Sequence, residues 1–97
     1  MALNRPKKNV NRAITSDGTF TDSAEIQGYF NVSISGTWVA TITVQRSFDF
    51  GDTWFDVKIF TKNAQEYGFE PENGVYYRIG VKAGEFTSGT INLRLSQ

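Results

Sequence analysis

The stretch VYYRIGVK, residues 75–82, decides the fold class of this 97-residue chain. Its apolar side chains fall on every second position, at Val75, Tyr77, Ile79 and Val81, and mostly polar or small residues lie between them. This period of two is typical of a β-strand with one buried face and one exposed face. We therefore predict a strand here and look for the same pattern elsewhere.

The alternation recurs along the rest of the chain, and no window carries a sustained helical stripe. It occurs at residues 29–34, 38–45, 54–60, 67–69 and 90–95, with weaker strands expected near 10–14 and 19–26. Val, Ile, Phe, Trp, Tyr and Thr make up 38 of the 97 residues, whereas Leu occurs three times. This composition favours strands. We expect about seven or eight of them.

The period predicts which side chains are buried and where the chain turns. The expected core-facing sets are Phe30, Val32 and Ile34; Trp38, Ala40, Ile42 and Val44; Phe55, Val57 and Ile59; and Ile91, Leu93 and Leu95. We expect turns at residues 35–36 and 71–74 because Gly, Pro and Asn favour turn conformations. We also expect a polar connection at residues 62–66. The strands at 38–45 and 54–60 are close enough to form a hairpin.

These strands predict an all-β fold, a single antiparallel β-sandwich of two sheets packed around one core. An immunoglobulin-like order and a jelly roll both fit strands this short, and residues 74–81 resemble the tyrosine-bearing penultimate strand of immunoglobulin-like sandwiches. We expect residues 1–22 to form a basic N-terminal arm with a first weak strand. Residues 23–97 are expected to form the sandwich domain.

The charge of the chain is uneven, although its net charge is zero. The first twelve residues carry four positive charges, at Arg5, Lys7, Lys8 and Arg12, and no acidic residue. The remaining residues are net acidic. The arm is either a solvated terminus or a segment that orders on an acidic partner. A basic tail on an acidic body does not favour nucleic acid, which normally requires a basic face.

The residue types that are missing restrict the chemistry. The chain has no Cys and no His, so it lacks thiolate nucleophiles, zinc–thiolate sites and the usual near-neutral proton shuttle. Asp49, Asp52 and Asp56 offer an alternative calcium site, but an EF-type loop needs further acidic positions that are absent. We expect no enzyme, no cofactor and no metal. No apolar run approaches a membrane span, so we expect a soluble chain without a membrane partner.

Residues 47–54, SFDFGDTW, form the most specific motif. They fit the pattern Ser-x-Asp-x-Gly-x-Thr-Trp and so resemble the Asp-box of sialidases and other β-propellers. The matching positions are Ser47, Asp49, Gly51, Thr53 and Trp54. The resemblance implies a structural hairpin turn remote from catalytic residues. A chain this short with one such box cannot supply the several blades of a propeller, so the motif predicts a hairpin and not a sialidase.

Four aromatic side chains are candidates for a contact patch. Phe48 and Phe50 occupy the variable positions of the Asp-box, where they either fold over the end of the sandwich as core or remain exposed for a partner. Tyr29 and Tyr76 fall on the polar faces of their strands.

Three segments give the chain a wider resemblance. Residues 36–49, 68–71 and 76–81 look like small virion proteins encoded among the head genes of tailed bacteriophages, and the likeness covers roughly residues 28–97. Proteins of this size and class in that group decorate the capsid. The resemblance implies a non-enzymatic decoration or cement protein that is made in the host cytoplasm and sits on the virion surface. It would bind the major capsid protein, clamp neighbouring subunits, and assemble as a dimer or trimer.

Two alternatives remain open at this point. In a carbohydrate-binding or tail-associated adhesion module, exposed aromatics such as Tyr29, Tyr76 or Phe50 would stack on sugar rings, whereas Trp38 falls on a buried face. The other alternative is a tail or connector structural subunit of the virion.

Overall fold

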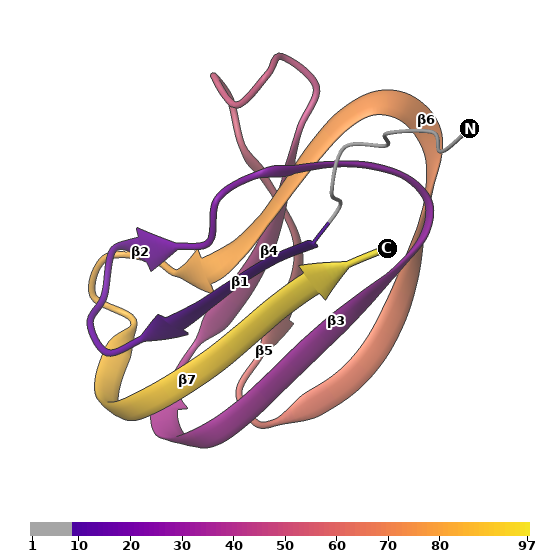
Figure 1. The fold of residues 1–97 in the computed structure, drawn as a ribbon. Coiled ribbons are helices and arrows are strands. Elements are labelled where there is room, and N and C mark those ends of the chain that lie inside the picture. Colours follow the sequence, from indigo (N-terminus) through magenta and orange to yellow (C-terminus); the bar gives the residue numbers. More distant parts are fainter. Residues whose placement is uncertain (1–8) are drawn as a thin grey trace.

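The computed structural model describes residues 9–97, which form seven β-strands and contain no helix (Figure 1). The strands are β1 (Asn9–Ile14), β2 (Thr19–Phe20), β3 (Ala24–Ala40), β4 (Ile42–Ser47), β5 (Phe55–Phe60), β6 (Ala64–Val81) and β7 (Phe86–Ser96). The predicted all-β class and the expected number of strands are confirmed. Arg5, Lys7 and Lys8 lie outside the described residues.

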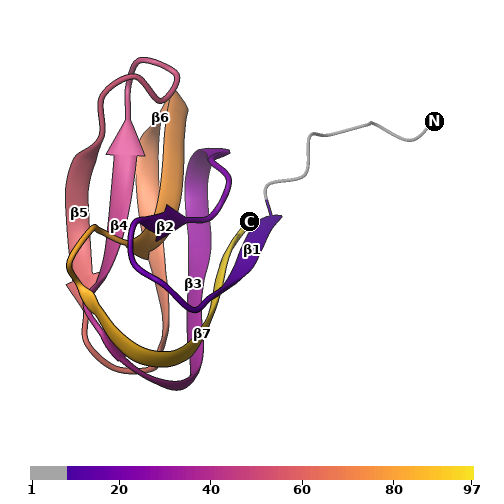
Figure 2. The same ribbon diagram turned by 90° about the vertical axis from the view of Figure 1, so that its left-hand side faces the viewer.

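The seven strands belong to one antiparallel sheet, ordered β1-β7-β3-β6-β4-β5, with β2 also paired to β6. Strand β6 pairs with β3 between residues 64 and 77 and with β4 through residues 76–80. The two sheets that we expected are therefore one continuous sheet, because β6 is long enough to serve both neighbours. The sheet curls so that β1, β7 and β3 face β4 and β5, as in a sandwich (Figure 2).

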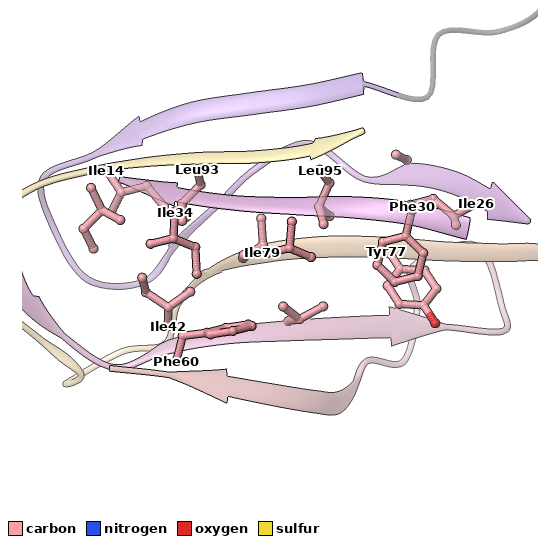
Figure 3. Packing of buried hydrophobic residues seen from close by; sticks show 14 of the residues in the cluster. Ile14, Ile26, Phe30, Ile34, Ile42, Phe60, Tyr77, Ile79, Leu93 and Leu95 are labelled. Carbon is pink, nitrogen blue, oxygen red and sulfur yellow. The ribbon is translucent and has the colours of Figure 1, made fainter. Parts of the chain in front are cut away.

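The core lies between these two halves of the curled sheet (Figure 3). Each strand except the short β2 contributes to it: Ile14 from β1, Ile34 from β3, Ile42 from β4, Phe60 from β5, Ile79 from β6 and Leu93 from β7. The alternating sets predicted in residues 30–34, 75–81 and 91–95 are all buried. The period of two therefore identified the buried face of the three longest strands.

The turn predicted at residues 35–36 is wrong, since β3 runs through it to Ala40. Gly36 adopts a φ of 108°, opposite Ile91 of β7, and a Cβ added to it would lie 2.4 Å from the carbonyl oxygen of Thr90. Glycine bends the strand here and lets β7 approach closely. The break between β3 and β4 falls instead at Thr41.

The turn predicted at residues 71–74 is also wrong, because β6 does not reverse there. Ile26 pairs with Val75 and Gly28 pairs with Glu70, so four residues of β6 lie opposite the single Gln27 of β3. The Pro and Gly of this segment form a large bulge that bends the strand. The polar connection predicted at 62–66 is shorter than expected, because β6 already begins at Ala64.

The prediction that Phe55, Val57 and Ile59 face the core is wrong. All three are exposed, whereas Phe60 is buried. Val44 pairs with Lys58 and Gln45 pairs with Asp56, so Val57 is an extra residue in β5 that disturbs the alternation. Within residues 9–97, β5 is also an edge strand with β4 as its one neighbour, so no further strand covers its other edge.

Trp38 is half-buried and packs against the core, in line with its predicted face. Its indole Nε1 donates a hydrogen bond to Asn63 Oδ1 at 2.7 Å, and Asn63 Nδ2 donates to the carbonyl of Gly36 at 3.0 Å. Asn63 therefore ties the β5–β6 loop to β3.

Replacing Gly36 by Ala should lower the free energy of unfolding by about 3 kcal/mol, because the new Cβ meets backbone as well as an unfavourable φ. Gly84 is the matched control: its φ is 80°, but a Cβ there meets nothing within 4 Å. Gly84→Ala should cost only about 1 kcal/mol. Urea unfolding of the two variants tests this, and equal losses would contradict the close approach of β7 at Gly36.

Candidate functional site

Residues 47–54, whose sequence resembles an Asp-box, connect β4 and β5 in a hairpin that is closed by side-chain hydrogen bonds. The Ser47 hydroxyl donates to Asp49 Oδ1 at 2.7 Å and accepts from the amide of Gly51 at 2.8 Å. Asp49 Oδ1 also accepts from the amide of Thr53 at 2.8 Å. The loop amides therefore find their partners inside the loop, which makes it a rigid connection.

These bonds explain the electrostatics of Asp49. The Ser47 hydroxyl, followed by the Thr53 amide, holds the pKa of Asp49 below its usual value, because both stabilise the ionised carboxylate. The carboxylate is used to shape the loop. Among residues 9–97, no three acidic side chains gather closely enough to hold a metal ion.

Trp54 folds back onto the sheet and anchors the loop. Its ring lies against Gly51, where an added Cβ would be 3.4 Å from Trp54 Cζ2. The guanidinium of Arg78 stacks between the rings of Trp54 and Phe20, with its Cζ 4.3 Å and 4.1 Å from the two ring centroids. Arg78 Nε also donates to Gln45 Oε1 at 2.9 Å. This stack joins β2, β6 and the loop, and burial lowers the pKa of Arg78.

Phe48 and Phe50 project from this anchored loop and neither belongs to the core. Phe50 is 81% exposed, and its φ of 60° makes it the one non-glycine residue with a positive φ within residues 9–97. Its ring centroid lies 5.8 Å from that of Tyr76. Phe48 lies 6.2 Å from Phe55 and 5.0 Å from the guanidinium of Arg46. Phe55 and Tyr77 both pair with Arg46, so Phe55 and Tyr76 lie on opposite faces of the sheet. We call the two aromatic pairs, Phe48 with Phe55 and Phe50 with Tyr76, the tip cluster.

A buried carboxylate, Glu70, is bonded to Arg46, the residue that contacts Phe48 of the tip cluster. Glu70 is 1% exposed, and its Oε1 accepts from the Tyr77 hydroxyl at 2.6 Å and from Arg46 Nη1 at 3.1 Å. Its Oε2 accepts from the amide of Glu72 at 3.0 Å. Burial alone raises the pKa of Glu70, but these donors outweigh it and leave the pKa below its usual value. Burial, helped by Glu70, raises the pKa of Tyr77 to about 12.

Tyr29 lies apart from the tip cluster, on the outer face of β3. Its ring centroid is 4.9 Å from that of Phe69 and 6.2 Å from that of Tyr67, and all three side chains are exposed. We call these three residues the aromatic platform. The alternation identifies Tyr67 and Phe69 as strand residues, but neither was predicted as a site residue. Tyr67 and Phe69 are two residues apart, and this spacing indicates that they share a face of the strand. The sequence does not indicate that Tyr29 joins them, because its position opposite Phe69 depends on the register between β3 and β6.

Arg12, grouped above with the basic arm, lies in β1. Its Nη1 donates to the carbonyl of Phe20 at 3.1 Å, and β1 pairs with β7 along its whole length. Arg12 therefore contributes to the sheet.

Comparisons with protein families, curated proteins and solved structures give no match to this chain. Within residues 9–97 the structure has no helix that could span a membrane.

Replacing Glu70 by Gln should lower the free energy of unfolding at pH 7 by about 1–3 kcal/mol, because the charged partner of Arg46 and of the Tyr77 hydroxyl is lost. The pKa of Glu70 is lowered by folding. Its ionisation therefore stabilises the protein above the unfolded-state pKa of about 4.3 and ceases to do so as the pH falls through the folded-state pKa.

The two stability curves should consequently converge below about pH 4. Unfolding by urea between pH 3 and pH 8 checks this. Exposed Glu66 provides the control, and Glu66→Gln should change stability by less than about 0.5 kcal/mol. A gap between parent and Glu70→Gln that stays constant down to low pH would refute the role of the ionised carboxylate.

Proposed function

We propose that this chain is a non-enzymatic structural protein of a tailed-phage virion, which binds the outer surface of the assembled capsid and joins neighbouring major capsid subunits. The proposal starts from the resemblance in residues 28–97. It is supported by a small single-sheet fold and by exposed aromatic residues held on a rigid loop. A decoration protein requires a stable shape and contact surfaces, and no reactive group.

The observation that carries the proposal is the position of Phe50. An aromatic residue with positive φ costs about 1–2 kcal/mol relative to glycine, and most of its ring is exposed to water. Such a cost is typical of residues that the surrounding structure holds for a function. Contact with another protein would bury the ring, and the free energy gained from burying its apolar surface would offset the cost of the positive φ.

The rest of the tip cluster has the composition of a contact site. Phe48 contacts both Phe55 and Arg46, and aromatic residues and Arg are enriched in protein interfaces. Arg46 is already paired with Glu70, which fixes the guanidinium before a partner arrives and reduces the entropy cost of binding.

The basic arm supplies a second contact in this proposal. Arg5, Lys7 and Lys8 would meet acidic groups on the capsid, and assembly as a dimer or trimer on a symmetry axis would place several tips on one shell. Weak contacts repeated in this way raise the overall avidity.

The test is co-sedimentation with mature phage heads that were assembled without this protein. The full chain should bind saturably at a fixed ratio to capsid subunits. Phe50→Asn should weaken binding at least about tenfold and leave stability unchanged or higher, because Asn tolerates a positive φ. Phe69→Ser, an exposed aromatic on the outer face, is the control and should bind like the parent.

A chain that starts at residue 9 tests the arm without removing residues of β1. Weaker binding by this chain would support the anchoring role of Arg5, Lys7 and Lys8, whereas full binding would place the contact in the tip cluster alone. Absence of binding by the full chain would overturn the decoration role. Equal binding by Phe50→Asn and the parent would overturn the tip cluster as the docking site.

A further inference from the structure

The outer face of β6, β3, β7 and β1 carries an ordered grid of polar and aromatic side chains. Directly opposed residues form two rows across the strands: Tyr67, Asn31 and Ser96 in one, and Gln65, Ser33, Arg94 and Asn11 in the next. Tyr29 and Phe69 pair in a neighbouring row. Arg94 is the one charged residue of these rows. A face of amides, hydroxyls, aromatic rings and one Arg offers hydrogen-bond partners and apolar ring faces to a ligand.

This face is hollowed beside the aromatic platform. A shallow, open depression of about 400 Å³ is lined by residues of β3, β6 and β7, namely Asn31, Val32, Ser33, Gln65, Glu66, Tyr67, Arg94 and Ser96. The carboxylate of Glu66 is paired with Lys58 of β5. Gln65 Nε2 donates to Ser33 Oγ at 2.9 Å, so part of the floor is fixed before any ligand arrives.

Two side chains of the depression, Tyr67 and Arg94, are exposed and can contact a ligand. Tyr67 is 75% exposed, and its ring centroid lies 6.2 Å from that of Tyr29. Arg94 makes no ion pair within residues 9–97. A free guanidinium is a bidentate donor suited to a carboxylate, and an exposed tyrosine offers an apolar ring face with a polar hydroxyl at its end.

We propose that this depression binds an acidic saccharide, a sugar that carries a carboxylate. A pyranose ring has an apolar C–H face, which stacks on Tyr67, and a rim of hydroxyls, which bond to Asn31, Ser33, Gln65 and Ser96. The carboxylate pairs with Arg94. The rows contain Ser33 and Ser96 and no Met, whereas Ser is depleted and Met enriched in protein interfaces, so this composition favours a saccharide over a protein partner.

The site shares no residue with the tip cluster, so it does not depend on the proposed capsid role. Tip contacts would attach the protein to the shell, and the sheet face would recognise a glycan.

The experiment titrates the full chain with a sialylated trisaccharide and with a galacturonate oligomer, each beside its uncharged counterpart, and follows backbone amide shifts by NMR. We expect saturable binding of at least one acidic sugar, with the largest shifts in residues 31–33, 65–67 and 94–96. Arg94→Gln should lower the affinity for the acidic sugar about tenfold or more and leave any affinity for the uncharged counterpart unchanged. Tyr67→Ala should weaken both.

Phe55→Ala, an exposed aromatic of the tip cluster, is the matched control and should bind like the parent. Melting temperatures of all variants verify that each is folded. Absence of binding by every sugar, or equal binding by the parent, Arg94→Gln and Tyr67→Ala, would overturn the proposal. Preference for the uncharged sugars would overturn the assignment of Arg94 to a carboxylate. Co-sedimentation with phage heads tests capsid binding by the tip cluster, and the NMR titration tests sugar binding by the depression. Failure of the sugar proposal is therefore distinguishable from failure of the capsid proposal.

Discussion

The pairing of β6 with β3 on one edge and with β4 on the other is the constraint on which the rest of the structure depends. A single strand can serve both halves of a curled sheet only if it bends, and the bulge at residues 71–74 provides that bend. Glu70 and Tyr77 lie on either side of the bulge and are joined by a short hydrogen bond. Arg46 of β4 joins the same carboxylate. The bend is therefore braced by a buried polar cluster, which costs little because every member has a partner.

The bend also determines where the two candidate surfaces lie. Tyr76 follows the bulge and meets Phe50 at the tip of the β4–β5 loop, whereas Tyr67 and Phe69 precede it and face outward beside Tyr29. The loop itself is held by Ser47 and Asp49 from within and by the Trp54–Arg78–Phe20 stack from below. Both surfaces are thus built on rigid elements, a property that favours recognition because little entropy is lost on binding.

Much of this arrangement follows from local sequence. Residues 75–81 and 91–95 alternate strictly, because each has one face on the core, and the loop bonds of Ser47 and Asp49 depend on neighbours in sequence. The errors arise where a residue has a partner distant in sequence. Gly36 continues a strand instead of ending it because β7 lies against it, Val57 is a bulge because of its pairing with β4, and the platform exists only through the register of β3 on β6. Periodicity indicates which face of a strand is buried and so excludes a shift by one residue, but it does not show which strand lies alongside or which residue lies opposite.

The two surfaces differ in the force that would hold a partner. The tip cluster is mainly aromatic, so burial of apolar area would dominate there and would depend little on ionic strength. The depression relies on Arg94, whose attraction for a carboxylate at an exposed site is screened by salt. The chain has no histidine, the side chain that ordinarily changes its charge between pH 5 and 8. Salt, and not pH near neutrality, is therefore the condition that separates the two modes of binding: the sugar should dissociate as ionic strength rises while contacts of the tip cluster persist.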